Sequence, residues 1–329
     1  MEIFDSVRTL WTRLTKGKEQ KAQKLSNTER PGLVGVTHEG ILDRDGCHLV
    51  YKEIGPKDAP VTVVFIHGFT LAADSFFMVT DYLRAQFPNV KSLLMDLRGH
   101  GETGEMPAEM LTIDACGDDI LALIRERSPQ SKIIFVGHSM GGLIALNALK
   151  KAPDNVAGLV LIASSIESLS SQGLPQVLAS PLADKAQEAV ELAPGDAQKM
   201  KDALATVLAP ALSATVFKRN GTDYNLVEFH ASMIDHTPLE TFVGFFDDLQ
   251  EHDELDAASS LQGVPGYILV GKKDDVTPES QADRIKELWP QAQEMRLDKA
   301  GHMLILETPD AVNEAIGDLV EGALGAIQP

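Results

Sequence analysis

Short apolar runs alternate with longer stretches of helical periodicity along most of the chain. The runs at residues 61–66, 92–95, 132–136, 157–162 and 267–270 are almost continuously apolar, which is typical of strands covered on both faces. Between most of them, stretches such as 112–127 and 142–151 repeat apolar residues at every third or fourth position. The alternation predicts an α/β fold with a mostly parallel, doubly wound sheet and helices on both faces.

Three weaker β-like runs flank this pattern. The first two, at residues 40–42 and 48–54, are separated by Asp43-Arg44-Asp45-Gly46, which has the residues of a tight turn. The third, at residues 294–297, follows the last strong run. We therefore expect the sheet to begin with two strands joined by a turn and to end close to residue 297.

The alternation stops after Ser165. Residues 166–250 contain no comparable strand run, whereas 183–192, 197–208 and 237–249 have helical character. The predicted organisation is an N-terminal helix with a linker (1–32), an α/β core formed by 33–165 and 251–329, and a helical cap or lid (166–250).

Several features of the predicted cap have two interpretations. Its apolar side chains either line an acyl pocket or form ordinary helix core, and Phe242, Phe245 and Phe246 either pack the cap on the core or face the pocket. His230 and His236 have no spacing typical of a metal site. The acidic residues 247–254 are predicted to be a solvated return to the core.

Residues 2–24 form a predicted basic, amphipathic helix. One stripe is apolar, and basic residues outnumber acidic ones in this segment. We favour a helix packed on its own domain or on a partner subunit. The alternative is a peripheral membrane contact, with the stripe lying in the lipid interface; the stripe consists of Ile3, Phe4, Val7, Leu10, Trp11 and Leu14.

Composition excludes several classes of protein. The 329 residues are 44% apolar and 23% charged, which fits a large globular core. The 29 basic and 48 acidic residues give a net charge of −19, which disfavours nucleic acid as a partner. Cys47 and Cys116 lie far apart, are expected to be buried, and form no zinc or disulfide pattern. Without a secretory signal pattern or an apolar run of about 20 residues, we expect a cytoplasmic protein, membrane-associated only if residues 2–24 bind lipid.

The strongest chemical motif is Gly137-His138-Ser139-Met140-Gly141, between a predicted strand and a predicted helix. A serine at such a junction occupies a sharp, strained turn that closes only if the residues two positions away are very small. The turn would present the Ser139 hydroxyl at the carboxyl edge of the sheet. It would also place the Met140 N–H at a helix amino end, where negative charge is favoured.

A serine hydroxyl needs a base and a group that orients the base. Asp274 and His302 each follow a predicted strand, so both are expected at the carboxyl edge of the sheet. Asp275 is the alternative carboxylate. Of the nine histidines, only His302 combines a preceding glycine with a strand-end position downstream of Asp274. His138 is expected to pack against the sheet, because strand alternation directs it away from Ser139.

A second donor for an oxyanion is predicted at His67-Gly68-Phe69. A glycine here lets the backbone approach closely enough for the Phe69 N–H to face Ser139, while His67 is expected to be structural. The segment Asp96-Leu97-Arg98-Gly99-His100-Gly101 is expected to form a hydrogen-bond network that stabilises its loop rather than to act in catalysis.

Taken together, these motifs resemble the α/β-hydrolase superfamily, in its branch of capped esterases and lipases, over about residues 33–320. The resemblance implies Ser139 as nucleophile, His302 as base, Asp274 as the residue that orients it, and the N–H groups of Phe69 and Met140 as oxyanion hole. It also implies two-step acyl transfer with neither a metal nor an organic cofactor.

The substrate we expect is a small uncharged acyl ester, lipid-like and of the monoacylglycerol type. The same triad also serves acyltransferases, thioesterases, and enzymes that hydrolyse amides or carbon–carbon bonds, because pocket shape decides between them. A ligand-binding protein without turnover is the remaining alternative.

Overall fold

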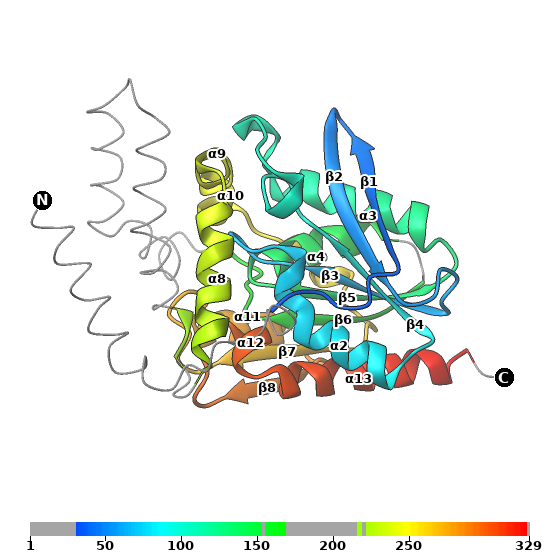
Figure 1. The fold of residues 1–329 in the computed structure, drawn as a ribbon. Helices are drawn as coiled ribbons and strands as arrows, with labels where there is room; N and C mark the ends of the chain where they lie inside the picture. The colour runs from blue at the N-terminus through cyan, green and yellow to red at the C-terminus, as the bar shows by residue number, and fades with distance from the viewer. Residues whose placement is uncertain (1–30, 153–154, 169–215, 219–221, 328–329) are drawn as a thin grey trace, which may run out of the picture.

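The computed structural model describes residues 31–152, 155–168, 216–218 and 222–327. At its centre is an eight-stranded sheet with the order β1-β2-β4-β3-β5-β6-β7-β8 (Figure 1). β1 and β2 pair antiparallel with their neighbours, and every pair from β4 to β8 in this order is parallel. The predicted mostly parallel sheet is therefore confirmed. The strands are β1 (His38–Arg44), β2 (Cys47–Ile54), β3 (Val61–Ile66), β4 (Val90–Met95), β5 (Lys132–His138), β6 (Val156–Ile162), β7 (Gly266–Gly271) and β8 (Gln293–Leu297).

The central strands are buried on both faces because apolar side chains fill both directions of the pleat. In β5, Ile133 and Phe135 join one buried cluster, while Ile134 and Val136 join the cluster on the opposite face. Successive side chains of a strand point to opposite faces, so a continuously apolar run supplies both layers of core.

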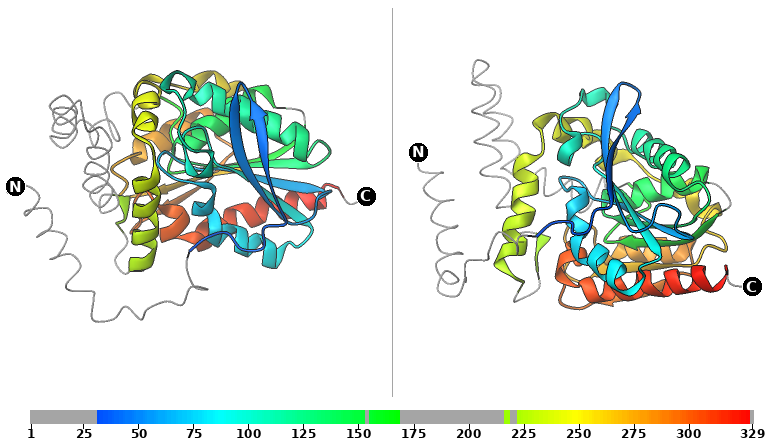
Figure 2. Two further views of the ribbon diagram at one scale, coloured as in Figure 1. Left: turned by 45° about the horizontal axis from the view of Figure 1, so that its top comes forward. Right: turned by 45° about the vertical axis from the view of Figure 1, so that its right-hand side comes forward.

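Helices cover both faces, as a doubly wound sheet requires. Buried residues of α3, α4 and α11 belong to one cluster, and those of α2, α12 and α13 to the other. Figures 1 and 2 show α2 and α13 side by side on their face of the sheet. The helices of the core are α2 (Phe77–Gln86), α3 (Ile113–Arg127), α4 (Met140–Lys151), α11 (Glu279–Leu288), α12 (Leu304–Glu307) and α13 (Pro309–Gly325), with short 3-10 turns at Ala73–Phe76, Gly101–Thr103, Ala108–Met110 and Leu255–Ser259.

The turn between β1 and β2 is tighter than predicted. The strands pair as far as Arg44 and Cys47, which leaves only Asp45 and Gly46 as turn residues. Both have positive φ, 53° and 82°. Two left-handed residues match the twist of a hairpin, and an aspartate followed by a glycine tolerates them well.

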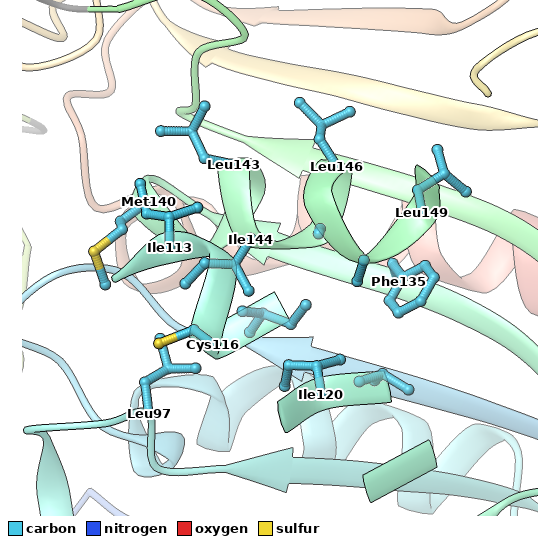
Figure 3. Close-up of a cluster of buried hydrophobic side chains, with 14 of the residues drawn as sticks. Leu97, Ile113, Cys116, Ile120, Phe135, Met140, Leu143, Ile144, Leu146 and Leu149 are labelled. Carbon is cyan, nitrogen blue, oxygen red and sulfur yellow. The ribbon is translucent and has the colours of Figure 1, made fainter. Parts of the chain in front are cut away.

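The helix that follows the candidate serine is firmly anchored. Figure 3 shows Met140 and Ile144 of α4 packed with Ile113 and Cys116 of α3 in one buried cluster. Full burial of an aliphatic side chain stabilises the fold by about 1.5–3 kcal/mol. The start of α4 is thus held by its own side chains. Cys47 and Cys116 are both free and buried, as predicted.

The described part of the predicted insertion contains helices. They are α8 (Tyr224–His236), α9 (Leu239–Gly244) and α10 (Phe246–Glu251), and α8 stands beside one edge of the sheet in both views of Figure 2. The helical stretch predicted at 237–249 is present with one interruption at Phe245, across which the Phe245 N–H donates to the Thr241 carbonyl (3.2 Å) and the Leu249 N–H to the Phe245 carbonyl (2.8 Å). α9 ends at Gly244, whose backbone approaches Leu111 so closely that a Cβ would lie 2.7 Å from its Cδ1.

Three sequence-based expectations fall outside the described residues. They are the N-terminal helix at 2–24 and the cap helices at 183–192 and 197–208. Among the helices that are described, none combines the length and apolar character needed to cross a membrane.

Candidate active site

Ser139 occupies a strained turn between β5 and α4. Its backbone has φ 55° and ψ −122°, a conformation that costs a residue with a side chain about 1–3 kcal/mol. The flanking glycines make the turn sterically feasible. A Cβ at Gly137 would collide with the carbonyl of Gly141, and one at Gly141 would collide with the carbonyl of Ile66. The predicted junction of strand, turn and helix is present.

Ser139, His302 and Asp274 form a continuous hydrogen-bonded chain. The Ser139 Oγ lies 3.0 Å from His302 Nε2, and His302 Nδ1 lies 2.8 Å from Asp274 Oδ2. Asp274 follows β7 and His302 follows β8, so three separate loops bring these side chains together at the carboxyl edge of the sheet. An imidazole so placed can take a proton from the hydroxyl while a carboxylate fixes its tautomer.

Asp274 is held as a carboxylate by several donors. Its Oδ1 accepts the N–H groups of Val276 (2.8 Å) and Thr277 (3.0 Å), and its Oδ2 accepts the Thr277 hydroxyl (2.7 Å). Burial alone would raise the pKa of Asp274, but His302 and the donors from Thr277 outweigh burial and lower it. Asp275, the alternative carboxylate, turns to the surface and pairs with Lys218 at 3.0 Å.

The predicted oxyanion donors lie on either side of Ser139. Met140 is the first residue of α4, so its N–H has no acceptor within the helix. A Cβ at Gly68 would lie 3.1 Å from the Ser139 Cβ, which brings the loop that carries the Phe69 N–H against the serine. Neither N–H donates a hydrogen bond to any residue within the described ranges. Both are available to an oxygen bound beside Ser139.

The segment 96–101 forms the predicted network. Asp96 accepts the N–H groups of Ala73 (2.7 Å) and Glu102 (2.9 Å), and Arg98 makes a two-pronged ion pair with Asp119 at 2.6 and 3.0 Å. These bonds tie the loop after β4 to the loop after β3 and to α3. The network stabilises the loops and makes no contact with the serine.

Three buried histidines are neutral parts of this scaffold. His67 Nε2 accepts the Leu97 N–H at 3.0 Å, and His100 Nε2 accepts the Thr70 N–H at 3.1 Å. Burial lowers the pKa of His67 well below its usual range and that of His100 to about 4. His138 Nε2 lies 3.0 Å from the His302 carbonyl oxygen, and burial lowers its pKa to about 3. His138 thus bonds the backbone of His302, and it is His302 whose ring bonds the Ser139 hydroxyl.

Sequence reasoning missed three side chains that hold the site. Thr277 supports Asp274, as described above. Ser164, which follows β6, donates its hydroxyl to the Ser139 carbonyl at 2.8 Å. Glu307, 2% exposed, accepts the Gly301 N–H at 3.0 Å, next to His302. The one available signal was Glu307 itself, an acidic residue that directly follows the apolar residues 303–306.

The described part of the insertion contacts the site. Thr241 in α9 donates its hydroxyl to the Gly99 carbonyl at 2.7 Å, and the Phe242 ring lies edge-on to Phe69 with centroids 5.2 Å apart. Phe245 is fully buried against His100, so it packs the insertion on the core; the Phe246 side chain lies outside the described part.

The return from the insertion is not fully solvated, so that prediction is wrong at Glu254. Glu254 is 0% exposed and accepts Asn147 Nδ2 at 2.8 Å. It also pairs with His252 at 2.7 Å and with Lys150 at 2.6 Å. With Asp114, the His252 and Glu254 side chains lie close enough to share a metal ion; in this structure Asn147 bonds both carboxylates and Lys150 pairs with Glu254. Buried charge is tolerated only with such partners.

His230 is another residue whose position the sequence did not indicate. It lies on α8, is 3% exposed, and meets the Phe217 ring edge-on with centroids 5.3 Å apart. Burial is the main cause that lowers the pKa of His230 to about 3, and the nearby His302 and His138 lower it further. An uncharged imidazole from the insertion thus lies near His302.

Comparisons with known proteins identify the same fold. A family model described as "alpha/beta hydrolase fold" matches residues 61–309. The pimeloyl-[acyl-carrier protein] methyl ester esterase of Klebsiella pneumoniae is 26% identical over 81% of this chain and 95% of its own length. The dihydrolipoyllysine-residue acetyltransferase component of the acetoin cleaving system of Pseudomonas putida is 28% identical over 82% of this chain, which spans only 65% of that protein. A solved thermophilic esterase from Thermogutta terrifontis has the same fold, with a TM-score of 0.67, 22% identity, and coverage of 88% and 98% of the two chains.

Proposed function

The chain belongs to the α/β-hydrolase family, and from this premise we propose that it is a serine hydrolase that cleaves carboxylic esters through an acyl-serine intermediate. The observation that carries the proposal is the pair of hydrogen bonds that joins the three side chains: Ser139 Oγ lies 3.0 Å from His302 Nε2, and His302 Nδ1 lies 2.8 Å from Asp274 Oδ2. The similarity to proteins named as esterases supports the same reaction class.

In the first half of the reaction, the Ser139 Oγ attacks the ester carbonyl carbon and its proton passes to His302 Nε2. The carbonyl oxygen becomes an oxyanion, which the N–H groups of Phe69 and Met140 stabilise. The carbon–oxygen bond to the alcohol then breaks, and the alcohol leaves with the proton from His302. The acid is still bound as an ester of Ser139.

In the second half, water donates a proton to His302 Nε2 and attacks the acyl carbon. The new oxyanion occupies the same two donors. Its collapse breaks the bond to Ser139, which regains the proton from His302, and the carboxylic acid leaves. Asp274 stays ionised throughout and stabilises the imidazolium that forms twice in the cycle.

For the substrate, we propose an uncharged, lipid-like acyl ester of the monoacylglycerol type, with residues 166–250 acting as a cap. Two phenylalanines of the insertion offer apolar contacts: Phe242 meets the Phe69 ring at 5.2 Å, and Phe229 meets the Phe77 ring at 5.6 Å. The net charge of −19 disfavours anionic substrates. A peripheral membrane contact through residues 2–24 would bring such substrates to the site; deletion of residues 1–28 should weaken liposome binding and spare turnover of soluble esters.

The test is a panel of p-nitrophenyl esters graded by chain length, run on the wild type and on Ser139→Ala. We expect turnover that increases with an apolar acyl chain and a loss of kcat of about 10³-fold or more in the variant, with the fold retained. A fluorophosphonate should label the wild type at Ser139. Ester turnover that survives Ser139→Ala, or a wild type that neither turns over nor labels, would overturn the proposal.

Acyl transfer to an acceptor other than water is the second candidate, because one similar protein is named as an acetyltransferase component. Both reactions share the acyl-serine and differ only in what attacks it. Adding a competing alcohol during turnover separates them: a hydrolase releases mainly the acid, whereas a transferase yields mainly the new ester.

A further inference from the structure

The carbonyl oxygen of Ser139 is held from two directions. It accepts the Gly142 N–H at 2.8 Å from within the first turn of α4. It also accepts the Ser164 hydroxyl at 2.8 Å, from the loop that follows β6. The second donor comes from a part of the chain 25 residues away and is not a consequence of helix formation.

This carbonyl belongs to the same peptide group as the Met140 N–H. A trans peptide is planar, and its C=O and N–H point in opposite directions; none of the described peptide bonds is cis. Whatever fixes the direction of the Ser139 carbonyl therefore fixes the direction of the Met140 N–H. A donor on the oxygen also polarises the group, which makes the N–H a better donor.

The position of Ser164 favours its hydrogen bond to the Ser139 carbonyl over any other contact of its hydroxyl. It is 6% exposed, and a Cβ at Gly142 would collide with its hydroxyl, so the side chain packs directly on the start of α4. Its other acceptor, the Ser165 carbonyl, is 3.4 Å away, too far for a good hydrogen bond. The preceding residue, Ala163, has φ 46° and donates its N–H to the Leu269 carbonyl, which aims Ser164 away from the line of β6.

The peptide between Gly68 and Phe69 has the same arrangement. The Gly68 carbonyl accepts the His67 Nδ1–H at 2.8 Å and the Leu71 N–H at 3.2 Å. Since His67 Nε2 accepts a backbone N–H, the proton of the neutral ring is on Nδ1. Each candidate oxyanion peptide thus has a buried side-chain donor on its carbonyl end.

We propose that Ser164 is a positioning residue for the proposed ester hydrolysis: its hydroxyl holds the carbonyl end of the Ser139–Met140 peptide and so aims the Met140 N–H at the developing oxyanion. This inference rests on the proposed function. Ser164 bonds the Ser139 carbonyl and takes no part in the hydrogen bonds that join Ser139 Oγ, His302 and Asp274. Loss of its hydroxyl should therefore slow the chemical step by less than loss of an oxyanion donor itself, which costs about 10²–10³-fold.

The experiment compares full-length wild type, Ser164→Ala, Ser164→Thr and Ser165→Ala. Ser165 is the matched control, because it is a neighbouring serine, 2% exposed, whose hydroxyl makes no hydrogen bond to a described residue. The readouts are kcat and KM for p-nitrophenyl butyrate and the inhibition constant of an aryl trifluoromethyl ketone, which forms a tetrahedral oxyanion on serine. Rates are normalised to active sites titrated with a fluorophosphonate, so a partly unfolded variant is still informative.

We expect Ser164→Ala to lower kcat about tenfold and to leave KM within about twofold. The inhibition constant of the ketone should increase by about the same factor as kcat/KM falls. Ser164→Thr, which keeps the hydroxyl, should recover most of both losses, and Ser165→Ala should change neither. Unchanged kcat and ketone affinity in Ser164→Ala would overturn this inference while leaving ester hydrolysis intact. A fall in kcat without weaker ketone binding would also overturn it. A wild type that neither turns over nor labels would overturn both proposals.

Discussion

The serine turn and the loops that carry Asp274 and His302 are rigid for different physical reasons. Backbone sterics are the main restraint on the turn, because the glycines at 137 and 141 sit where any Cβ would meet a carbonyl oxygen, and the Ser164 hydroxyl adds one side-chain donor. Hydrogen bonds hold the loops of Asp274 and His302: the Thr277 hydroxyl bonds Asp274, and Glu307 bonds the Gly301 N–H beside His302. The first region should fail abruptly when a single methyl is added. The second should lose function gradually as donors and acceptors are removed one at a time.

The largest effect is expected from Gly141→Ala. Its new Cβ would collide with the Ile66 carbonyl and lie 2.6 Å from the His67 carbonyl, and neither backbone group can move without disturbing β3. Overpacking of this kind costs about 1–3 kcal/mol or more in the free energy of unfolding. We also expect ester turnover to fall more than 100-fold, because the strained turn cannot close. Denaturant unfolding and kcat measure the two effects.

The matched control for that substitution is Gly322→Ala in α13. No atom lies within 4 Å of the added Cβ, and the residue has ordinary helical φ, so the variant should be more stable by about 0.5–1 kcal/mol. If Gly141→Ala were as stable and as active as Gly322→Ala, backbone sterics would not be what holds the turn.

In the loop that carries His302, Glu307→Gln should cause a partial loss of both stability and turnover. The carboxylate accepts the N–H groups of Gly301 and Lys218, each at 3.0 Å, and an amide can accept only one of them. One buried N–H left without an acceptor costs about 1–3 kcal/mol in stability. Because Gly301 precedes His302, we expect kcat to fall about tenfold with little change in KM. Glu321→Gln, an exposed position on α13, is the control. Equal kcat in both variants would count against a role for Glu307 in placing His302.

A smaller effect should follow Thr277→Val. The change removes the hydroxyl donor to Asp274 Oδ2 but leaves both backbone donors and His302 in place. The pKa of Asp274 is lowered in the folded protein, so its contribution to stability is present above its ordinary value of 3.8 and is lost as pH falls through the lowered pKa. Thr277→Val should raise that pKa toward 3.8. The variant should be about 1 kcal/mol less stable at neutral pH, with kcat a few-fold lower. The deficit should shrink in acid; a deficit independent of pH would mean that the hydroxyl does not act on the carboxylate.

The two regions also differ in how far the sequence predicted them. The serine turn was predictable because steric demands appear as glycines at fixed spacing between a strand and a helix. Ser164 and Thr277, in loops after strands, and Glu307, at the end of α12, were not, because none of them stands in a distinctive spacing; the only mark was that Glu307 follows four apolar residues. The choice between Asp274 and Asp275 stayed open for the same reason: loop conformation, which the local sequence does not specify, turns one carboxylate to His302 and the other to Lys218.

In the fold, too, features set by local sequence were predictable and features set by distant contacts were not. Continuous apolar runs predicted the parallel strands and their order along the chain, because a strand that is buried on both faces is apolar at almost every position. The one-residue interruption between α9 and α10, at Phe245, has no counterpart in the helical periodicity of 237–249. Glu254 appeared to belong to a solvated acidic stretch, because its partners Asn147 and Lys150 lie on α4, more than 100 residues earlier.

The smallest predicted effect tests whether the serine helix also depends on hydrogen bonds. Burial alone would lower the pKa of His252, but its bond to Glu254 and the nearby Asp248 and Asp114 raise it. A raised pKa means that protonated His252 stabilises the fold fully below its ordinary value of 6.5 and that this stability is lost as pH rises through the raised pKa. The free energy of unfolding should therefore fall by about 1 kcal/mol across that interval, and His252→Gln should abolish the fall. His48→Gln, at an exposed position of β2, is the surface-histidine control. A wild-type stability that is flat over this interval would show that the His252–Glu254 pair contributes nothing measurable to the support of α4.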